Sequence, residues 1–287
     1  MKLLLKREDV NLNGRSKKSL TPLAWAARNG HKGVVELLLK QKDVNLSERS
    51  KKSLTPLAWA ARNGRKGVVE LLLKRRDVNL NEPSKNGQTP LSWAAWNGHN
   101  RVVKRLLERE DLSADSPDDH GRTPLSLAAG NGHSRVVKLL SGQEDLSADS
   151  PDDYGRTPLS RAAENGHSRV VKLLLGRKDV NPDWPDHHGQ TPLSLAACGG
   201  HDRVAKLLLR REEVTPDMPD NRDQTPLSWA ARNGHVRVVR LLLEWGGVSP
   251  DSIDSDGKTP LSLATAFGHK GVVKLLKARR PANPRMV

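Results

Sequence analysis

The sequence predicts an all-α solenoid, in which short helix-turn-helix repeats stack on one another and hairpin-like fingers project between them. Two observations support this prediction. The dipeptide Thr-Pro recurs every 34 residues without insertion, and each copy opens two short stretches with the apolar spacing of helices. Helices this short are not stable alone in water, so the repeats must stack, and we expect a curved rod with eight helix pairs. The copies begin at Thr21, Thr55, Thr89, Thr123, Thr157, Thr191, Thr225 and Thr259.

The 34-residue period divides the chain into eight repeats with a short segment at each end. Residues 1–8 match the second helix of a repeat whose first helix is absent, so we expect a remnant of a preceding repeat. Residues 281–287 depart from the pattern, and we expect them to form a C-terminal tail. This division leaves no segment of these 287 residues for a separate catalytic domain. The repeats are residues 9–42, 43–76, 77–110, 111–144, 145–178, 179–212, 213–246 and 247–280.

The first helix of each repeat is predicted from its end signals, as residues 21–42 illustrate. Thr21 is a favourable N-cap, and Pro22 suits the first helical position because the N–H that it lacks would be unpaired there. Leu and Ala within residues 23–27 provide a small apolar face. Gly30, which recurs in every repeat, predicts a helix end at a residue with positive φ.

The second helix follows this glycine, with Val34, Val35, Leu38 and Leu39 at helical spacing. Leu38 is the strictest position, which predicts the deep core, whereas its neighbours vary and should be partly exposed. A polar stretch rich in Asn, Asp, Pro, Ser and Gly then predicts the finger between repeats. The equivalents of Leu38 are Leu72, Leu106, Leu140, Leu174, Leu208, Leu242 and Leu276.

The repeat reads Thr-Pro-Leu-x-x-Ala-Ala-x-x-Gly-His-x-x-Val-Val-x-Leu-Leu-Leu and then Asp-Val-Asn, most fully in residues 225–243. Over nearly the whole chain this closely resembles the ankyrin repeat. The resemblance implies stacked helix pairs whose first helices line a concave surface, and a non-enzymatic role in protein–protein interaction. The 34-residue Thr-Pro-Leu-Ser type is similar to arrays of filamentous fungi, which often follow a nucleotide-binding switch domain.

Two features depart from the ankyrin pattern. The usual period is about 33 residues, and the additional residue here falls in the finger. The His that normally follows Thr-Pro-Leu is Ala24 and Ala58 in the first two repeats and Ser in the others, such as Ser92 and Ser228. This replacement puts in question the hydrogen bond by which that His usually joins finger and helix.

Composition limits the compartment. The single cysteine, Cys198, excludes an intrachain disulfide framework and fits a reducing environment. No apolar stretch is long enough to cross a bilayer, and residues 1–6 lack the apolar core of a signal peptide. We therefore expect an intracellular protein that does not enter a membrane, in the cytoplasm or alternatively in the nucleus.

Residue patterns that could support chemistry are explained better by structure. Ser and His recur together in six repeats, as in Ser228 and His235, but an active site is not normally repeated along an array. The His column lies in successive helices about 8–10 Å apart, too far to share a zinc ion with bonds of about 2 Å. A structural hydrogen bond is the expected role of these rings. We predict no catalytic, cofactor-binding or metal-binding residue.

The most variable positions of the repeat lie three residues apart on one face of the first helix. Trp and Arg, the residues most enriched at binding hot spots, occupy this face in the first three repeats. The alternative is that each Trp packs between helices. The predicted partner-binding residues on this face are Trp25, Arg28, Trp59, Arg62, Trp93 and Trp96.

Charge is distributed unevenly along a chain of net charge +15. Residues 1–88 carry +12, residues 89–258 carry −3 and residues 259–287 carry +6. The early fingers are basic, whereas later ones such as residues 115–119 are acidic; the alternative is that solvated fingers drift freely in charge. The finger residues predicted to contact a partner are Lys17, Lys18, Lys51 and Lys52.

The leading functional hypothesis is a monomeric, non-enzymatic scaffold that binds a protein partner with an acidic segment through the fingers and the concave helix face. Charge would steer the encounter, while Trp supplies buried area. Nucleic-acid binding is the alternative, since a basic surface with interleaved Trp suits it, although the acidic middle would repel phosphate. A third hypothesis makes the array the sensor or autoinhibitory region of a larger nucleotide-binding switch protein.

Overall fold

The computed structural model describes residues 11–17, 19–51, 53–143 and 146–279. Regular structure within these residues is entirely helical, with sixteen helices and no strand, which confirms the all-α prediction. The expected remnant at residues 1–8 and the expected tail at residues 281–287 lie outside the described residues. The chain forms two compact halves, Met1–Ser147 and Ala148–Val287.

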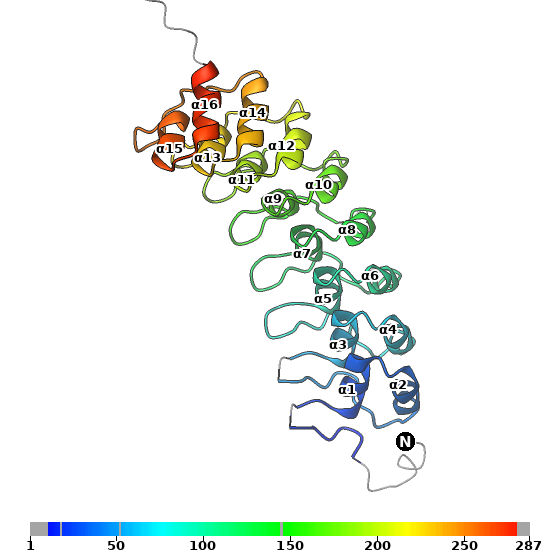
Figure 1. The fold of residues 1–287 in the computed structure, drawn as a ribbon. Helices are drawn as coiled ribbons and strands as arrows, with labels where there is room; N and C mark the ends of the chain where they lie inside the picture. Colours follow the sequence, from blue (N-terminus) through cyan, green and yellow to red (C-terminus); the bar gives the residue numbers. More distant parts are fainter. Residues whose placement is uncertain (1–10, 18, 52, 144–145, 280–287) are drawn as a thin grey trace, which may run out of the picture. The chain divides into compact units, whose positions relative to one another are not determined.

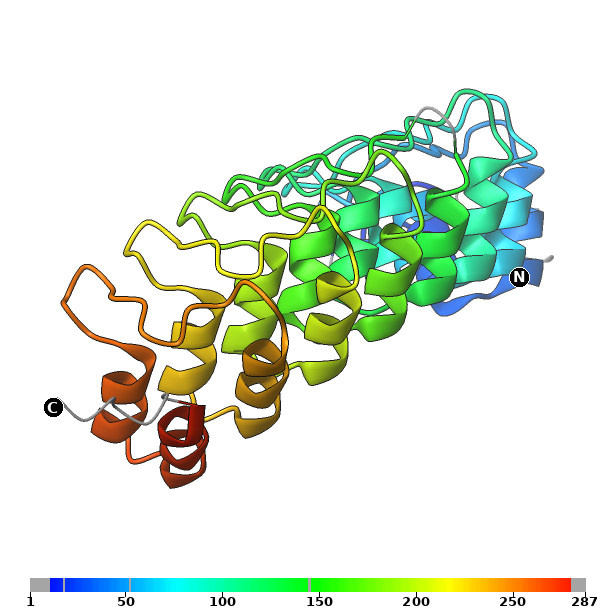
Figure 2. The ribbon, with the colours of Figure 1, turned by 90° about the horizontal axis from the view of Figure 1, so that it is seen from above.

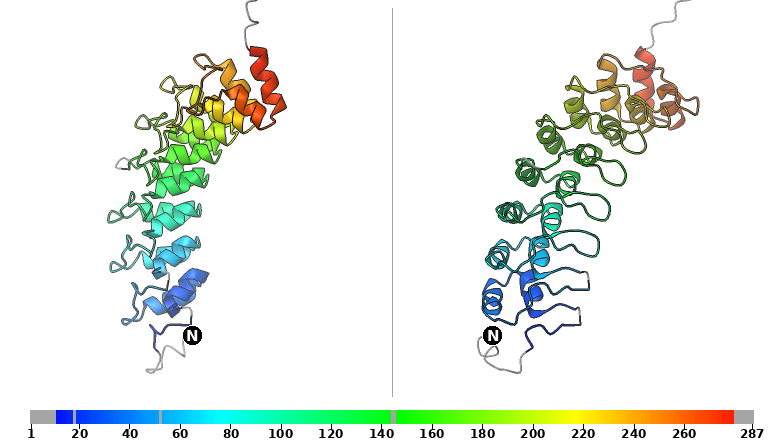
Figure 3. Two further views of the ribbon diagram at one scale, coloured as in Figure 1. Left: turned by 90° about the vertical axis from the view of Figure 1, so that its left-hand side faces the viewer. Right: turned by 180° about the vertical axis from the view of Figure 1, so that it is seen from behind.

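The N-terminal half contains four helix pairs (Figure 1). The first helices pack on one another in one row and the second helices in a parallel row, as Figure 1 and the right view of Figure 3 both show. In order the helices are α1 (Pro22–Asn29), α2 (Lys32–Leu39), α3 (Pro56–Arg62), α4 (Lys66–Leu72), α5 (Pro90–Trp96), α6 (Asn100–Leu107), α7 (Pro124–Gly130) and α8 (Ser134–Leu140).

The C-terminal half repeats this arrangement with four further pairs. Within each half the fingers, which are the segments between a second helix and the next first helix, leave the helix pairs on the same side (Figure 2). The helices are α9 (Pro158–Glu164), α10 (Ser168–Leu174), α11 (Pro192–Cys198), α12 (Asp202–Leu209), α13 (Pro226–Arg232), α14 (Val236–Glu244), α15 (Pro260–Ala266) and α16 (Lys270–Arg279).

The predicted helix ends are confirmed. Every first helix has a Thr at its N-cap whose hydroxyl accepts from the backbone N–H three residues later, as Thr21 does from Ala24 at 3.2 Å, followed by Pro. The glycines after the first helices have φ between +67° and +81°. A second constraint acts at Gly98, where a Cβ atom would lie 2.6 Å from the His133 ring of the next pair. A substitution there meets both strain and a clash.

The Leu38 column forms the deep core as predicted, since each of its eight side chains is at most 3% exposed. Val35 is also buried, whereas Leu37 and Leu39 beside it are half-buried. The first helices contribute the small apolar face expected for them, with Leu23, Ala26 and Ala27 fully enclosed. Burial of these aliphatic side chains between successive pairs stabilises helices too short to form alone.

The His column has the structural role expected from the sequence. The Nε2 atom of His99 donates to the carbonyl oxygen of Arg62 at 3.0 Å, and that of His133 donates to Trp96 O at 2.9 Å. The acceptor is in each case at the C-terminal end of the preceding first helix, where helix carbonyls lack internal partners. Arg65, which replaces His in the second repeat, makes the same contact through Nε at 3.2 Å from Arg28 O.

A buried aspartate organises the finger turn of the five later repeats. In Asp220, for example, Oδ1 accepts from the backbone N–H groups of Arg222 and Gln224 at 2.9 and 3.0 Å. The Ser that replaces the usual His after Thr-Pro-Leu pairs with the cap, as Ser228 does with Thr225 at 3.2 Å. The buried finger aspartates are Asp118, Asp152, Asp186, Asp220 and Asp254.

Candidate functional site

The six predicted helix-face residues lie on α1, α3 and α5 but differ widely in exposure. Trp25 is 50% exposed, and its ring contacts that of His31 at a tilt of 30°, with centroids 5.0 Å apart. Trp59 is only 8% exposed, and Trp93 and Trp96 are half-buried. Among these Trp residues, Trp25 therefore presents most of its ring to a partner.

Four of these residues come together in one row across the N-terminal half. The guanidinium carbon of Arg28 lies 4.9 Å from the centroid of the Trp59 ring. That of Arg62 lies 5.7 Å from the Trp59 ring and 4.3 Å from the Trp93 ring. Each distance is within the range of a cation–π contact. We call Arg28, Trp59, Arg62 and Trp93 the Arg–Trp row; Trp25 and Trp96 lie outside it.

The two cations of the Arg–Trp row have no carboxylate partner in the described part of the chain. Burial, and then the charge of Arg28, hold the pKa of the Arg62 guanidinium below its ordinary value. Arginine side chains carry a positive charge at neutral pH. The row therefore presents two neighbouring positive charges that no carboxylate among the described residues neutralises.

Trp59 also belongs to the core. It forms a buried cluster with Leu20, Ala24, Leu54 and Ala58, against which Trp93 packs. The alternative weighed above, that a Trp packs between helices, therefore describes Trp59 well. Its ring also supports the guanidinium groups of Arg28 and Arg62, which lie against it.

The basic fingers are partly neutralised by their neighbours. Arg15 pairs with Glu48, and Arg49 pairs with Glu82, each in the following finger. Lys17 and Lys51 are exposed and form no ion pair within the described ranges. Lys18 and Lys52, the other two predicted contacts, lie outside the described residues.

In the C-terminal half a finger carboxylate neutralises one cation of a first helix, Arg161. Nε of Arg161 donates to Asp152 Oδ2 at 2.7 Å, across nine residues from finger to helix. The Asp220 carboxylate reaches α13 in the same way and accepts from the indole Nε1 of Trp229 at 2.9 Å. These aspartates are buried, and the sequence analysis did not connect them with the helix face.

The same half contains an aromatic contact that the sequence analysis also missed. The guanidinium carbon of Arg232 lies 5.7 Å from the Trp229 ring and 5.4 Å from the ring of Phe267, which is 53% exposed. Phe267 follows Arg232 by 35 residues, one position beyond the equivalent of Arg232 in the last repeat. Its resemblance to the Arg–Trp row makes Arg232 a matched control for that row.

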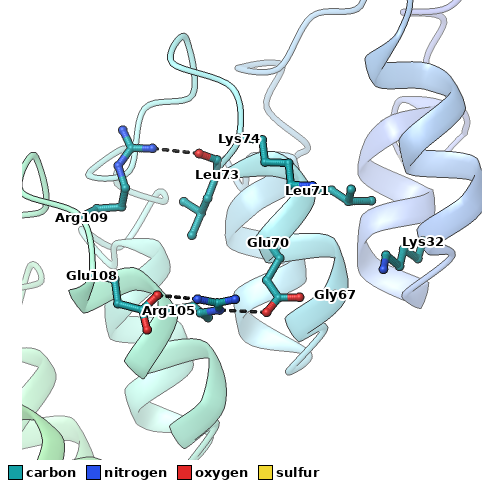
Figure 4. A pocket seen from close by; sticks show the side chains of 9 residues that line it. All are labelled: Lys32, Gly67, Glu70, Leu71, Leu73, Lys74, Arg105, Glu108 and Arg109. Atoms are coloured by element: carbon teal, nitrogen blue, oxygen red, sulfur yellow. Dashed lines mark hydrogen bonds and ion pairs between the residues drawn. The ribbon is translucent and has the colours of Figure 1, made fainter.

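A shallow hollow lies between the second helices α2, α4 and α6 of the N-terminal half (Figure 4). Its volume is about 440 Å³, and it opens where Gly67 lacks a side chain. Arg105 bridges Glu70 at 2.8 Å and Glu108 at 2.6 Å across its floor. The lining carries charges of both signs and no histidine, serine or cysteine. Nothing in it suggests a reaction.

A family model described as ankyrin repeats in three copies matches the chain over residues 1–82, 75–150, 144–220 and 212–285. The chain belongs to the ankyrin-repeat family. No curated protein matches it. Ankyrin repeats generally mediate protein–protein interaction, and their fold is typically a non-enzymatic binding module. No helix in the described ranges is long and apolar enough to span a bilayer.

Proposed function

We propose that this ankyrin-repeat chain holds an acidic segment of a protein partner against the Arg–Trp row and the neighbouring basic fingers. The observation that supports the proposal most strongly is that Arg28 and Arg62 contact a Trp ring but no carboxylate among the described residues. Both lie against the ring of Trp59. Stacking on indole rings fixes the guanidinium planes, so less side-chain entropy is lost when a carboxylate binds.

The charges around the row support the same partner. Two guanidinium groups that share one ring repel each other, and a carboxylate of the partner would relieve that repulsion. Lys17 and Lys51 extend the positive field onto the finger tips, where exposed charges chiefly accelerate association. The predicted Lys18 and Lys52 would add to this field.

The geometry favours a protein partner over a nucleic acid. Single-stranded nucleic acids bind by stacking bases on open aromatic faces. In the Arg–Trp row the ring of Trp59 is buried, and the rings of Trp59 and Trp93 already contact guanidinium groups. Of the four predicted Trp residues, only Trp25 is as much as half exposed, which is little for a base-stacking groove.

The test is a titration of the full chain with a labelled poly-glutamate peptide and, separately, with random single-stranded and duplex oligonucleotides. We expect Arg28→Gln together with Arg62→Gln to weaken peptide binding roughly tenfold or more, since close charge pairs couple strongly. The matched control, Arg232→Gln, should leave it unchanged. Oligonucleotide binding that remains tight at physiological salt would contradict the proposal, because nonspecific attraction to a basic protein fades there.

A further inference from the structure

The finger aspartates show which chemical group the first helices accept from the finger side. Asp220 Oδ2 accepts from Trp229 Nε1 at 2.9 Å, and Asp152 Oδ2 accepts from Arg161 Nε at 2.7 Å. In both cases the aspartate stands five residues before the Thr of Thr-Pro. Its carboxylate accepts a hydrogen bond from a residue of the following first helix, nine positions further along the chain. The C-terminal half thus shows how a carboxylate binds to this position of a first helix.

The first three repeats lack that carboxylate. Ser50 and Ser84 stand five residues before Thr-Pro, where later repeats have Asp. The corresponding helix residues are Trp59 and Trp93, and their Nε1 atoms are buried without a hydrogen-bond partner in the described structure. The hydroxyl of Ser84 is also buried and unpaired. A buried donor without an acceptor is destabilising, so these indole groups favour any acceptor that reaches them.

The surrounding charge selects an anionic acceptor. Trp59 and Trp93 are the rings against which Arg62 lies, at 5.7 and 4.3 Å, and Arg28 lies against Trp59 at 4.9 Å. A carboxylate near the two indole nitrogens would therefore meet both unpaired N–H donors and unneutralised guanidinium groups. In the C-terminal half the two kinds of donor are satisfied separately, the guanidinium group of Arg161 by Asp152 and the indole N–H of Trp229 by Asp220.

We propose that an Asp or Glu side chain of the partner takes, in trans, the position that the finger aspartates take in cis. It would accept from the indole Nε1 of Trp59 or Trp93 and neutralise Arg62. This inference rests on the proposed function and names the group that is recognised and the donors that recognise it. Because both nitrogen atoms are covered, the finger side chains must move aside as the carboxylate enters.

The first experiment follows the indole N–H resonances of the full chain by NMR, with assignments from single Trp→Phe variants. Poly-glutamate peptide should move the Trp59 or Trp93 N–H resonance downfield, because a new charged acceptor deshields the proton. The Trp229 resonance should not move, since Asp220 already occupies its donor. Poly-glutamine peptide of the same length should move none of them.

The second experiment supplies the carboxylate in cis. Ser50→Asp together with Ser84→Asp should raise the melting temperature and weaken poly-glutamate binding roughly tenfold or more, because the site is filled and its charge reduced. A melting temperature that does not fall shows that the loss is not due to unfolding. The control Ser50→Ala adds no acceptor and should leave binding unchanged.

Two results would overturn the inference and leave the proposed function in place. One is peptide binding that depends on Arg28 and Arg62 while no indole resonance moves. The other is a Trp59 resonance that in the free protein already matches that of Trp229, which would mean that water satisfies the donor. Failure of poly-glutamate to bind at all would overturn both proposals.

Discussion

In α13 the indole of Trp229 is bonded to the finger carboxylate of Asp220. In α3 the indole N–H of Trp59 has no acceptor among the described residues, and its ring is surrounded by Leu20, Leu54 and alanines. Both sites lie on a first helix that begins after a Thr N-cap and is followed by a glycine with positive φ. They differ at the finger position that is Asp in one and Ser in the other. Trp59 is thus held by apolar contacts, and the neighbouring Arg28 and Arg62 have no ion-pair partner among the described residues. In the C-terminal half, finger carboxylates instead bond Arg161 and Trp229.

The largest expected effect comes from removing the apolar support of the Arg–Trp row. Trp59→Ala should lower the free energy of unfolding of the N-terminal half by about 4 kcal/mol, as for other buried aromatic truncations. Trp25→Ala, at a half-exposed ring, should change it by less than about 0.5 kcal/mol. Amide exchange in each half, measured at increasing urea concentration, gives both changes in unfolding free energy. Equal effects would break the distinction between these two Trp residues.

A smaller effect should separate the two kinds of indole. Trp229→Phe removes the donor to Asp220, whereas Trp59→Phe removes an indole that has no acceptor. Because the change in ring size is common to both, Trp229→Phe should destabilise by about 2 kcal/mol more, the magnitude of a bond to a charged group. Unfolding free energies of the two variants test this. A larger loss from Trp59→Phe would show that its N–H is satisfied.

The smallest expected effect is a pH dependence from finger aspartates whose carboxyl pKa is raised by burial; one of them, Asp115, lies in the N-terminal half and two in the C-terminal half. Burial raises the pKa of Asp149 and Asp217, whose Oδ1 atoms are buried without a partner in the described residues. A raised folded-state pKa means that folding favours the protonated carboxyl. This contribution is present below the unfolded pKa of about 3.9 and is lost as pH rises through the folded pKa.

Asparagine at the equivalent position in the N-terminal half shows how to remove this dependence. The amide of Asn81 donates to Asp111 O at 2.8 Å, a bond that an ionised Asp cannot make. Asp149→Asn with Asp217→Asn should therefore raise the melting temperature at pH 7 and flatten its pH dependence. Melting curves between pH 3 and 7 measure both quantities. An unchanged slope would mean that other carboxyl groups control it.

Much of the fold could be predicted from periodicity, because helix caps, glycine stops and the Leu38 column are local or repeat at a fixed offset. The His column was predicted for the same reason. The burial of Trp59 could not be predicted, since it depends on Leu20 and Leu54 meeting it from two different fingers. The neutralisation of Arg161 was also missed, although the change from Ser to Asp was visible, because nothing local shows that the finger returns to the helix.

The acceptors of the His column are backbone carbonyls, and this affects how such an array can evolve. The oxygens belong to the variable helix-face positions, occupied by Arg62, Trp96, Glu164, Cys198 and Arg232. Each bond spans 37 residues whatever the side chain is. An in-frame duplication or deletion of 34 residues restores every such bond, and a substitution on the helix face leaves it intact. Recombination can therefore change the number of repeats, and point mutation can change the helix-face side chains. Neither change breaks the His–carbonyl hydrogen bonds between successive repeats.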